Sequence, residues 1–262
     1  MVLSVLLKFI FPPAASVVIR AMSAISLLSM SNAGLMEVKG KSMQYSKLLS
    51  SNNDKARVRG KVGMIAAYTP AFLAGTFSLF IFPHGDLRFT LLRSAITTHF
   101  FKRLFEVMFV HKYSGFMEKE TMVAISVSYF LYSAIMIYCQ QLMLQLPEPS
   151  IDLKYIGIPI FLVGIGGNFY HHYLLSKLRS EGEKQYRIPK GGLFSLVVCP
   201  HYLFEIIGFW GISCISQTLY SISFSLGSTL YLMGRSYATR RWYHSKFEDF
   251  PKDVKAFIPF IF

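Results

Sequence analysis

The feature that most constrains this chain is a series of long stretches that are apolar on every side. A soluble helix carries one apolar stripe, whereas a segment that crosses a bilayer needs about 20 mostly apolar residues. The stretches of this kind are Leu3–Ala33, Val62–Phe82, Phe89–Val110, Thr121–Leu146, Tyr155–Leu178, Leu193–Ser216 and Leu219–Tyr237. The sequence therefore predicts an all-α, polytopic membrane protein of about seven transmembrane helices, folded as a single domain over residues 1–262.

Composition and charge agree with this fold class. Hydrophobic residues make up 53% of the chain and charged residues only 16%, which is the wrong balance for a soluble globule of this size. The net charge of +13 comes mainly from lysines and arginines in a few loops and the tail. Such loops reflect membrane topology, so we expect a membrane-embedded protein and no nucleic acid as a partner.

The basic segments predict the orientation of the helices. Lysine and arginine gather in the segments 35–61, 177–190 and 235–255, which we assign to the cytoplasmic side. The connections Pro83–Arg88 and Pro147–Lys154 and the link near Gln217 alternate with them and carry few cations. An odd number of spans, with the N-terminus away from the cytoplasm, satisfies all of these assignments.

Two of the apolar stretches contain unusual residues. The first includes Pro12, Pro13 and Arg20, is too long for the core of a secretory signal and has no obvious cleavage site, so we expect it to remain as a membrane helix. The third is too polar to face lipid and should face the bundle interior or a wet cavity. Its polar residues are Arg93, His99, Lys102, Arg103 and Glu106.

Four polar clusters fall at or just inside the cytoplasmic boundary of the membrane. A spacing of four residues places two side chains one helical turn apart on one face, as for Asn168 and His172 or His201 and Glu205. The clusters are Asn168, His171, His172 and Arg179; the loop Glu183–Gly192, with Tyr186 and Arg187; His201, Tyr202 and Glu205; and Arg235, Thr239 and Tyr243.

The balance of charge in these clusters favours an anionic ligand. Polar groups in an apolar medium must pair with each other, with water or with a ligand. Internal ion pairing, such as Glu205 with Arg179 or Arg187, is one explanation. Cations outnumber carboxylates, however, and arginine suits phosphate because its planar fork donates hydrogen bonds in pairs. A phosphate-rich ligand of dinucleotide size therefore fits these clusters.

Several known signatures are missing from the sequence. No GxGxxG follows a strand, and close helix packing is the better explanation for the glycines of Gly164–Gly167. There is no GxSxG or HExxH motif, the three cysteines lack metal-ligand spacing, and the neighbouring His171 and His172 point to different helix faces. We expect no metal, and a nucleotide held among the helices themselves.

Four motifs resemble the steroid 5α-reductase family, which includes very-long-chain enoyl-CoA reductases and polyprenol reductases. Two of them, QYRIPKGGLFSLVVCPHYLFEIIGFWG and RRWYHSKFEDFPKDVKAFIPFIF, lie within a continuous match over about residues 150–262, the expected catalytic region. Upstream, HFFKRLFEVMFVHKYSG is similar to the enoyl-CoA and polyprenol branches, and YSKLL also fits the family.

The resemblance implies an NADPH-dependent reductase of an activated carbon–carbon double bond. Such an enzyme would reside in the endoplasmic reticulum membrane as a multi-pass protein. It would act on a lipid substrate, a steroid or an acyl-CoA, with other lipid-synthesis enzymes as candidate partners. By position, the cofactor contacts would fall on Asn168, His172, Arg179, Tyr186, Arg187, His201, Glu205, Arg235 and Tyr243.

The chain departs from the steroid branch at the catalytic positions. The steroid reductases have a Glu before the Pro of the second span, where this chain has Tyr68. They have a Tyr in the third span, where this chain has Phe100. On the fifth span, His172 stands in place of their Asp. We expect Tyr68 or Tyr202 to donate the proton, with anchoring at the membrane interface as the alternative role for each.

These departures leave more than one substrate open. A 3-oxo-steroid with a 4-ene is the first expectation and a trans-2-enoyl-CoA is the second, followed by a polyprenol. A family member that has lost catalysis is the alternative from another functional class.

Overall fold

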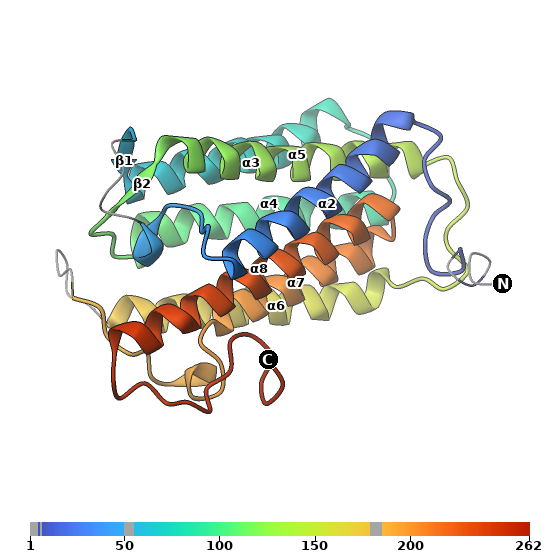
Figure 1. The fold of residues 1–262 in the computed structure, drawn as a ribbon. Helices are drawn as coiled ribbons and strands as arrows, with labels where there is room; N and C mark the ends of the chain where they lie inside the picture. Colours follow the sequence, from blue (N-terminus) through green and yellow to red (C-terminus); the bar gives the residue numbers. More distant parts are fainter. Residues whose placement is uncertain (1–4, 6, 50–54, 179–184) are drawn as a thin grey trace.

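The computed structural model describes residues 5, 7–49, 55–178 and 185–262. Within these residues, seven long helices run side by side as a bundle, which confirms the all-α fold class (Figure 1). The helices are α2 (Val17–Val38), α3 (Gly60–Ile81), α4 (Leu87–Phe105), α5 (Lys119–Met143), α6 (Lys154–Lys177), α7 (Pro200–Ser216) and α8 (Leu219–Lys246). The short elements are η1 (Ser46–Leu48), β1 (Arg57–Arg59), η2 (Glu106–Val110), β2 (Phe116–Glu118) and η3 (Gly192–Ser195).

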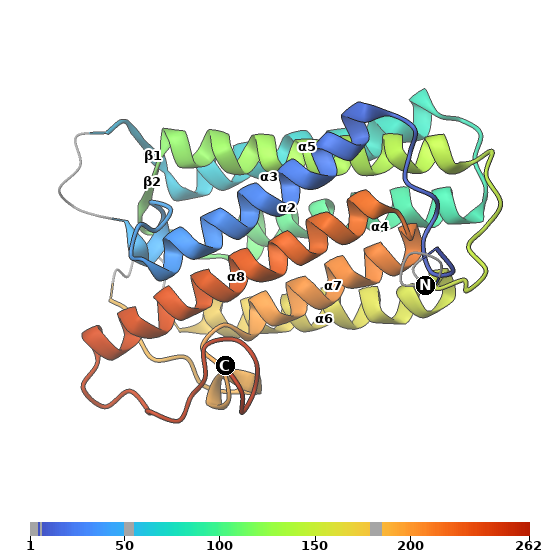
Figure 2. The same ribbon diagram turned by 45° about the vertical axis from the view of Figure 1, so that its right-hand side comes forward.

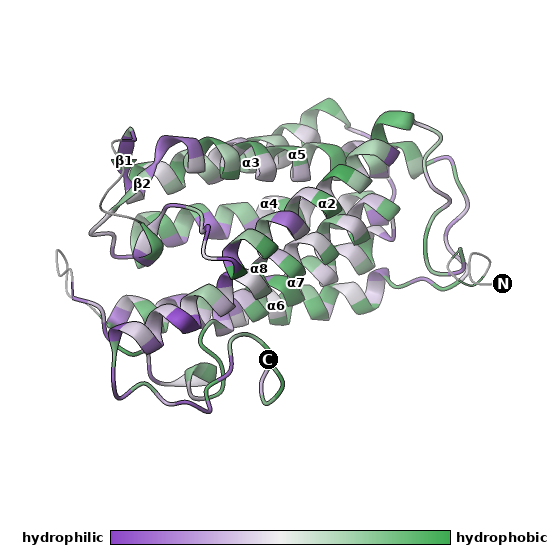
Figure 3. Ribbon diagram, in the orientation of Figure 1, coloured by the Kyte–Doolittle hydropathy of each residue, from purple (hydrophilic) through white to green (hydrophobic). Residues whose placement is uncertain are grey.

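Three of the described helices, α2, α3 and α5, are long and apolar enough to cross a membrane by themselves. The remaining long helices carry more polar residues, which the bundle interior accommodates. Figure 3 shows hydrophobic residues along the labelled helices, with hydrophilic residues interspersed. The chain is a helical membrane protein.

Two predicted helix starts are wrong, and prolines account for both. Helix α2 begins at Val17, because Pro12 and Pro13 cannot supply the backbone hydrogen-bond donors of a helix interior. The Ser16 hydroxyl caps α2 by accepting a hydrogen bond from the Ile19 amide at 3.4 Å. Helix α7 begins at Pro200, where a proline is tolerated in the first turn, and not at Leu193.

The helices pack in pairs, and glycines bring two of these pairs into backbone contact. Helix α6 packs against α7, α2 against α8, and α3 against α5. A Cβ atom at Gly164 of α6 would lie 2.2 Å from the Gly208 amide nitrogen of α7, and one at Gly234 of α8 would lie 2.2 Å from the Gly34 carbonyl oxygen of α2. The predicted packing role of Gly164 is confirmed.

Helix α4 lies inside the bundle and buries most of its charged side chains. Arg93, His99, Arg103 and Glu106 are all buried, which confirms that the third apolar stretch faces inward. A π-helical turn, Glu106–Val110, follows α4 directly. Insertions of this kind are frequent at functional sites, and Glu106 here begins one beside the cavity described below.

The two ends of the bundle differ. The described parts of the three basic segments lie towards the same end, where the antiparallel ribbon of β1 and β2 joins the segments before α3 and α5 (Figures 1 and 2). At the opposite end, Arg88 is fully buried. Its guanidinium contacts Glu148 and Asp152 and donates to the carbonyl oxygen of Ile215 at 2.6 Å. This network ties α4 to the α5–α6 connection and to the end of α7.

Candidate active site

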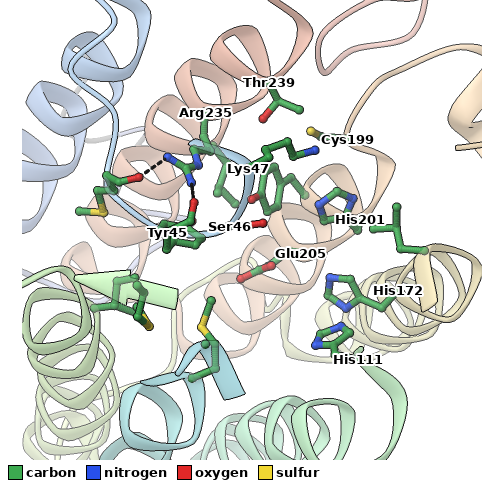
Figure 4. Close-up of a pocket in the computed structure, with 18 of the residues that line it drawn as sticks. Tyr45, Ser46, Lys47, His111, His172, Cys199, His201, Glu205, Arg235 and Thr239 are labelled. Carbon is green, nitrogen blue, oxygen red and sulfur yellow. Dashed lines mark hydrogen bonds between the residues drawn. The ribbon is translucent and has the colours of Figure 1, made fainter. Parts of the chain in front are cut away.

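A cavity of about 530 Å³ lies inside the bundle near the basic end. Every long helix contributes to its wall, together with the segments around residues 43–47 and 111–117. Figure 4 shows that His111, His172 and His201 gather on one side of this pocket, with Glu205 and Arg235 across from them. The cavity is the meeting point of groups that lie far apart in the sequence.

Most of the residues predicted at the site line this cavity. They are Tyr68, His172, Tyr186, Arg187, His201, Tyr202, Glu205, Arg235 and Tyr243. Asn168 is buried behind the wall, where its side-chain amide donates to the carbonyl oxygen of His201 at 2.7 Å and its oxygen contacts Lys102. Arg179 lies outside the described residues. The structure thus brings most of these residues to one cavity, and their roles remain proposals.

His171 has a structural position outside the cavity wall. Its Nδ1 atom lies 2.7 Å from the Gly167 carbonyl oxygen, and its Nε2 atom accepts a hydrogen bond from the Leu193 amide at 3.1 Å. The turn before Leu193 contains Gly191 and Gly192 with φ angles of 85° and 52°, a left-handed backbone that favours glycine. The ring of His171 therefore fixes the turn that leads the chain back towards α7.

His201 presents an unpaired polar atom in the cavity wall. It lies in the first turn of α7, and the residue is 9% exposed. Among the described residues, its Nδ1 atom is buried and has no hydrogen-bond partner. A buried polar group without a partner costs free energy, so this atom marks a position where a bound ligand would complete the hydrogen bonding.

The segment Met43–Lys47 forms a strap that Arg235 of α8 holds in place. The Arg235 guanidinium donates to the Glu37 carboxylate at 2.9 Å and to the Met43 carbonyl oxygen at 3.0 Å. It also lies 4.1 Å from the ring centroid of Tyr45, within cation–π range. Arg235 therefore lines the cavity and also holds the strap in place over it.

The strap brings to the cavity four residues that were not among the predicted site residues, Met43, Tyr45, Ser46 and Lys47. Tyr45 and Lys47 both line it, and Lys47 Nζ lies 4.6 Å from the ring centroid of Tyr243. The only sequence signal for them is the YSKLL motif, which by itself does not reveal that a segment after α2 folds over α8. Glu37 was also missed, because its partner Arg235 lies 198 residues away.

A buried ion-pair network lies on the side of the cavity formed by α3, α4 and α6. Arg103 Nη2 donates to the Tyr68 hydroxyl oxygen at 2.5 Å, and Arg103 Nη1 donates to Glu106 Oε2 at 2.6 Å. The His172 Nδ1 atom lies 3.0 Å from Glu106 Oε1, and Lys102 Nζ lies 3.1 Å from the same oxygen. One carboxylate thus serves two cations and a histidine, which leaves the network with excess positive charge.

Glu106, His111 and His172 form a group with metal-ligand chemistry, since their nearest ligand atoms all lie within 4.8 Å of one another. The Arg103 and Lys102 cations already contact the Glu106 carboxylate. A divalent ion would have to share this carboxylate with two positive charges, so we assign the group to the ion-pair network. Burial, with the His172 ring and the Arg103 guanidinium nearby, lowers the pKa of His111 to about 2, which keeps this ring neutral.

The cavity also has an apolar part, which lies between α2, α5 and α8. Its wall there includes Met30 and Ala33 of α2, Ile125 of α5 and Leu232 of α8. One cavity therefore joins a cationic region to an apolar region. Such a wall suits a ligand pair in which one member is anionic and the other is a lipid.

Comparison with known proteins connects this geometry to a family. The profile of the family described as 3-oxo-5-alpha-steroid 4-dehydrogenase matches residues 120–262. The matched region includes α5 to α8 and the C-terminal segment, and so contributes much of the cavity wall.

Individual relatives come from two kinds of enzyme. The 3-oxo-5-alpha-steroid 4-dehydrogenase 2 of Macaca fascicularis is 39% identical over 135 residues, which cover 51% of this chain and 52% of that protein. The very-long-chain enoyl-CoA reductase of Dictyostelium discoideum is 33% identical over 165 residues, 62% of this chain and 55% of that protein. Steroid 5-alpha-reductase DET2 of Gossypium hirsutum is 43% identical over 107 residues, 40% of this chain and 42% of that protein. The matched region spans about half the length of these relatives.

Proposed function

Because the chain belongs to the 3-oxo-5-alpha-steroid 4-dehydrogenase family, we propose that it is a membrane reductase that uses NADPH to saturate an activated carbon–carbon double bond of a lipid. The observation that carries this proposal is the single cavity with a cationic region and an apolar region. We place the enzyme in the endoplasmic reticulum membrane, with the cavity's basic end towards the cytoplasm, where NADPH would enter.

The residues of the cationic region fit a nicotinamide dinucleotide. Arg187 and Lys47 line it and carry the charge that phosphate groups require, and the unpaired Nδ1 atom of His201 offers a further hydrogen-bonding position. Tyr186 and Tyr243 add aromatic surface to the same wall. The cofactor, when bound, would supply a hydride from its nicotinamide ring.

The protein's own part in the reaction is to hold the two ligands and to stabilise developing charge. Hydride addition to the β-carbon of an enone or enoyl thioester builds negative charge on the substrate's carbonyl oxygen. A hydrogen-bond donor aimed at that oxygen lowers the barrier by a few kcal/mol. Tyr68 and Tyr202 both line the cavity and are the phenols proposed for this role. The apolar region between α2, α5 and α8 would hold the hydrocarbon part of the substrate.

The first substrate we propose is a 3-oxo-steroid with a 4-ene. The second is a trans-2-enoyl-CoA, which is favoured by the relative in Dictyostelium discoideum, because that match covers more of this chain than the matches to the two steroid reductases described above. This chain also has Tyr68 and Phe100 where the steroid branch has its catalytic Glu and Tyr. The enoyl-CoA alternative therefore has to be tested.

A direct assay separates the substrates. The purified protein in lipid nanodiscs would be incubated with NADPH and either a 3-oxo-4-ene steroid or a trans-2-enoyl-CoA, and the product mass would be measured. A gain of two hydrogens by the steroid supports the first proposal. Saturation of the acyl chain alone supports the second, and no reduction of either substrate, or of a polyprenol, favours a family member without catalytic activity.

Nucleotide binding tests the cofactor site separately from turnover. Arg187→Ala should weaken NADPH binding about 10- to 100-fold, because charge-assisted hydrogen bonds contribute about 1.5–3 kcal/mol. Lys246→Ala, a change at an exposed cation at the end of α8, is the control and should leave the dissociation constant unaltered. Equal binding by the wild type and Arg187→Ala would contradict the proposed cofactor site.

A further inference from the structure

Arg103 determines the direction of the hydrogen on the Tyr68 hydroxyl. A guanidinium has donors and no acceptor, so in the 2.5 Å contact the Tyr68 oxygen must accept. The phenol hydrogen then has to point elsewhere. In the part of the chain that the structure describes, no group accepts it, and Tyr68 lines the cavity. The geometry therefore leaves this hydrogen available to a ligand in the cavity.

Arg103 is itself held in a fixed orientation. Its Nη1 atom donates to Glu106 Oε2 at 2.6 Å, while His172 and Lys102 contact the other oxygen of that carboxylate. The His172 Nδ1 atom lies 3.0 Å from Glu106 Oε1 and also 3.0 Å from Arg103 Nη1, so this ring packs against both members of the ion pair. Arg103 and Glu106 are both buried, which prevents water from competing for these bonds.

Tyr202, the other phenol in the cavity, has different surroundings. Its ring packs against His201, with the ring centroids 4.2 Å apart. No charged side chain among the described residues lies within hydrogen-bond distance of its hydroxyl group. A phenolate formed at Tyr68 would have a cation 2.5 Å away, whereas one formed at Tyr202 would have no such partner.

On the basis of the function proposed above, we propose that Tyr68 is the proton donor and that Arg103 is its positioning residue. As hydride adds to the β-carbon, the π bond breaks and an enolate forms on the substrate. The Tyr68 O–H bond then breaks, its proton passes to the enolate oxygen, and Arg103 stabilises the phenolate that remains. The enol takes a proton from water at its α-carbon and loses the proton on its oxygen, which returns to Tyr68 through water. The substrate thus gains one proton and one hydride, which bound NADPH would supply.

Two substitutions test these roles. Tyr68→Phe should lower kcat about 100-fold, which is within the usual range for loss of a general acid, with little change in NADPH affinity. Arg103→Lys keeps the charge, but a single ammonium cannot reproduce the fork that joins Tyr68 to Glu106. It should lower kcat about 10-fold and leave KM and NADPH affinity nearly unchanged, which is the split expected when an interaction made only in the transition state is lost.

The double variant separates positioning from a general structural effect. If Arg103 acts through Tyr68, then Arg103→Lys should have no further effect on kcat in the Tyr68→Phe background. Multiplicative losses, or a Tyr68→Phe variant with full activity, would overturn the proposal. Tyr138→Phe, at an exposed tyrosine of α5 outside the cavity wall, is the matched control and should retain full activity. A 100-fold loss in Tyr202→Phe with intact Tyr68→Phe activity would assign the proton to Tyr202 and overturn the proposal.

The outcome for the wild type distinguishes this proposal from the one on which it rests. A wild-type protein that binds no NADPH and reduces none of the substrates overturns both. An active wild type whose variants behave otherwise than described overturns only the roles of Tyr68 and Arg103. Thermal unfolding of each variant in nanodiscs, with NADPH affinity measured alongside, shows whether the fold survives the substitution.

Discussion

At the scale of single residues, polar side chains define the cavity wall. Some of their hydrogen bonds are made within the protein, and others have no partner among the described residues. Arg235 and Arg103 have several partners each, which fixes their side chains before any ligand arrives. The Nδ1 atom of His201 has none in the described structure. Arg103 Nε, on the same wall, is also buried without a partner in the described structure. A preorganised wall with unmet hydrogen bonds is suited to a ligand that brings the missing partners.

His201 provides the prediction at this scale. His201→Ala should weaken NADPH binding about 5-fold, because one hydrogen bond contributes roughly 1 kcal/mol. His244→Ala, at an exposed histidine of α8, is the control and should have no effect. Titration of bound NADPH by its fluorescence measures both constants. Unchanged affinity in His201→Ala would remove this side chain from the cofactor site.

At the scale of elements, backbone contact between helices sets the shape of the cavity wall. Helix α6 carries His172 and helix α7 carries His201 and Glu205, so the spacing of these two helices decides how their side chains meet. That spacing depends on Gly164, which faces Gly208 without room for a methyl group.

Two glycines of the same helix test this dependence. Gly164→Ala would place a Cβ atom 2.2 Å from the Gly208 amide nitrogen, whereas Gly166→Ala would meet no atom within 4 Å. We expect the first substitution to lower the thermal unfolding midpoint and weaken NADPH binding. The second should preserve both, and slightly stabilise the helix, since alanine is a better helix former than glycine. Equal behaviour of the two variants would show that α6–α7 contact does not set the cavity.

At the scale of the whole molecule, the two ends of the bundle have separate tasks. The basic end contains the cavity and its strap, while the opposite end is closed by the Arg88 network. This network joins segments that lie more than 60 residues apart in the sequence, such as α4 and the end of α7. It stabilises the bundle without reaching the cavity wall.

Replacing Arg88 should therefore affect stability and leave binding intact. Arg88→Met removes the partner of Glu148 and Asp152 and leaves the Ile215 carbonyl unsatisfied, which we expect to cost about 2–3 kcal/mol in the free energy of unfolding. The NADPH dissociation constant of the folded protein should stay the same. Arg20→Met, at an exposed arginine, is the control for thermal unfolding. A variant that unfolds like the wild type but loses NADPH binding would contradict this division of tasks.

The sequence by itself determined the fold class, the inward face of α4 and most of the cavity residues. Apolar runs specify membrane helices because lipid offers no hydrogen bonds to the backbone, and a four-residue spacing places side chains such as His201 and Glu205 on one face. Buried charge was also recognisable, since residues such as Arg103 and Glu106 are too costly to expose to lipid.

Only the tertiary structure decided which of these groups meet. The pairing of Arg235 with Glu37, the strap that carries Lys47, and the hydrogen bond from Arg103 to Tyr68 each join segments separated by tens to hundreds of residues. Local spacing contains no information about such contacts, because they depend on how α2, α3, α4 and α8 pack. The start of α2 was missed for a local reason. The apolar residues before Pro12 continue the hydrophobic run, but α2 begins only at Val17, after the two prolines.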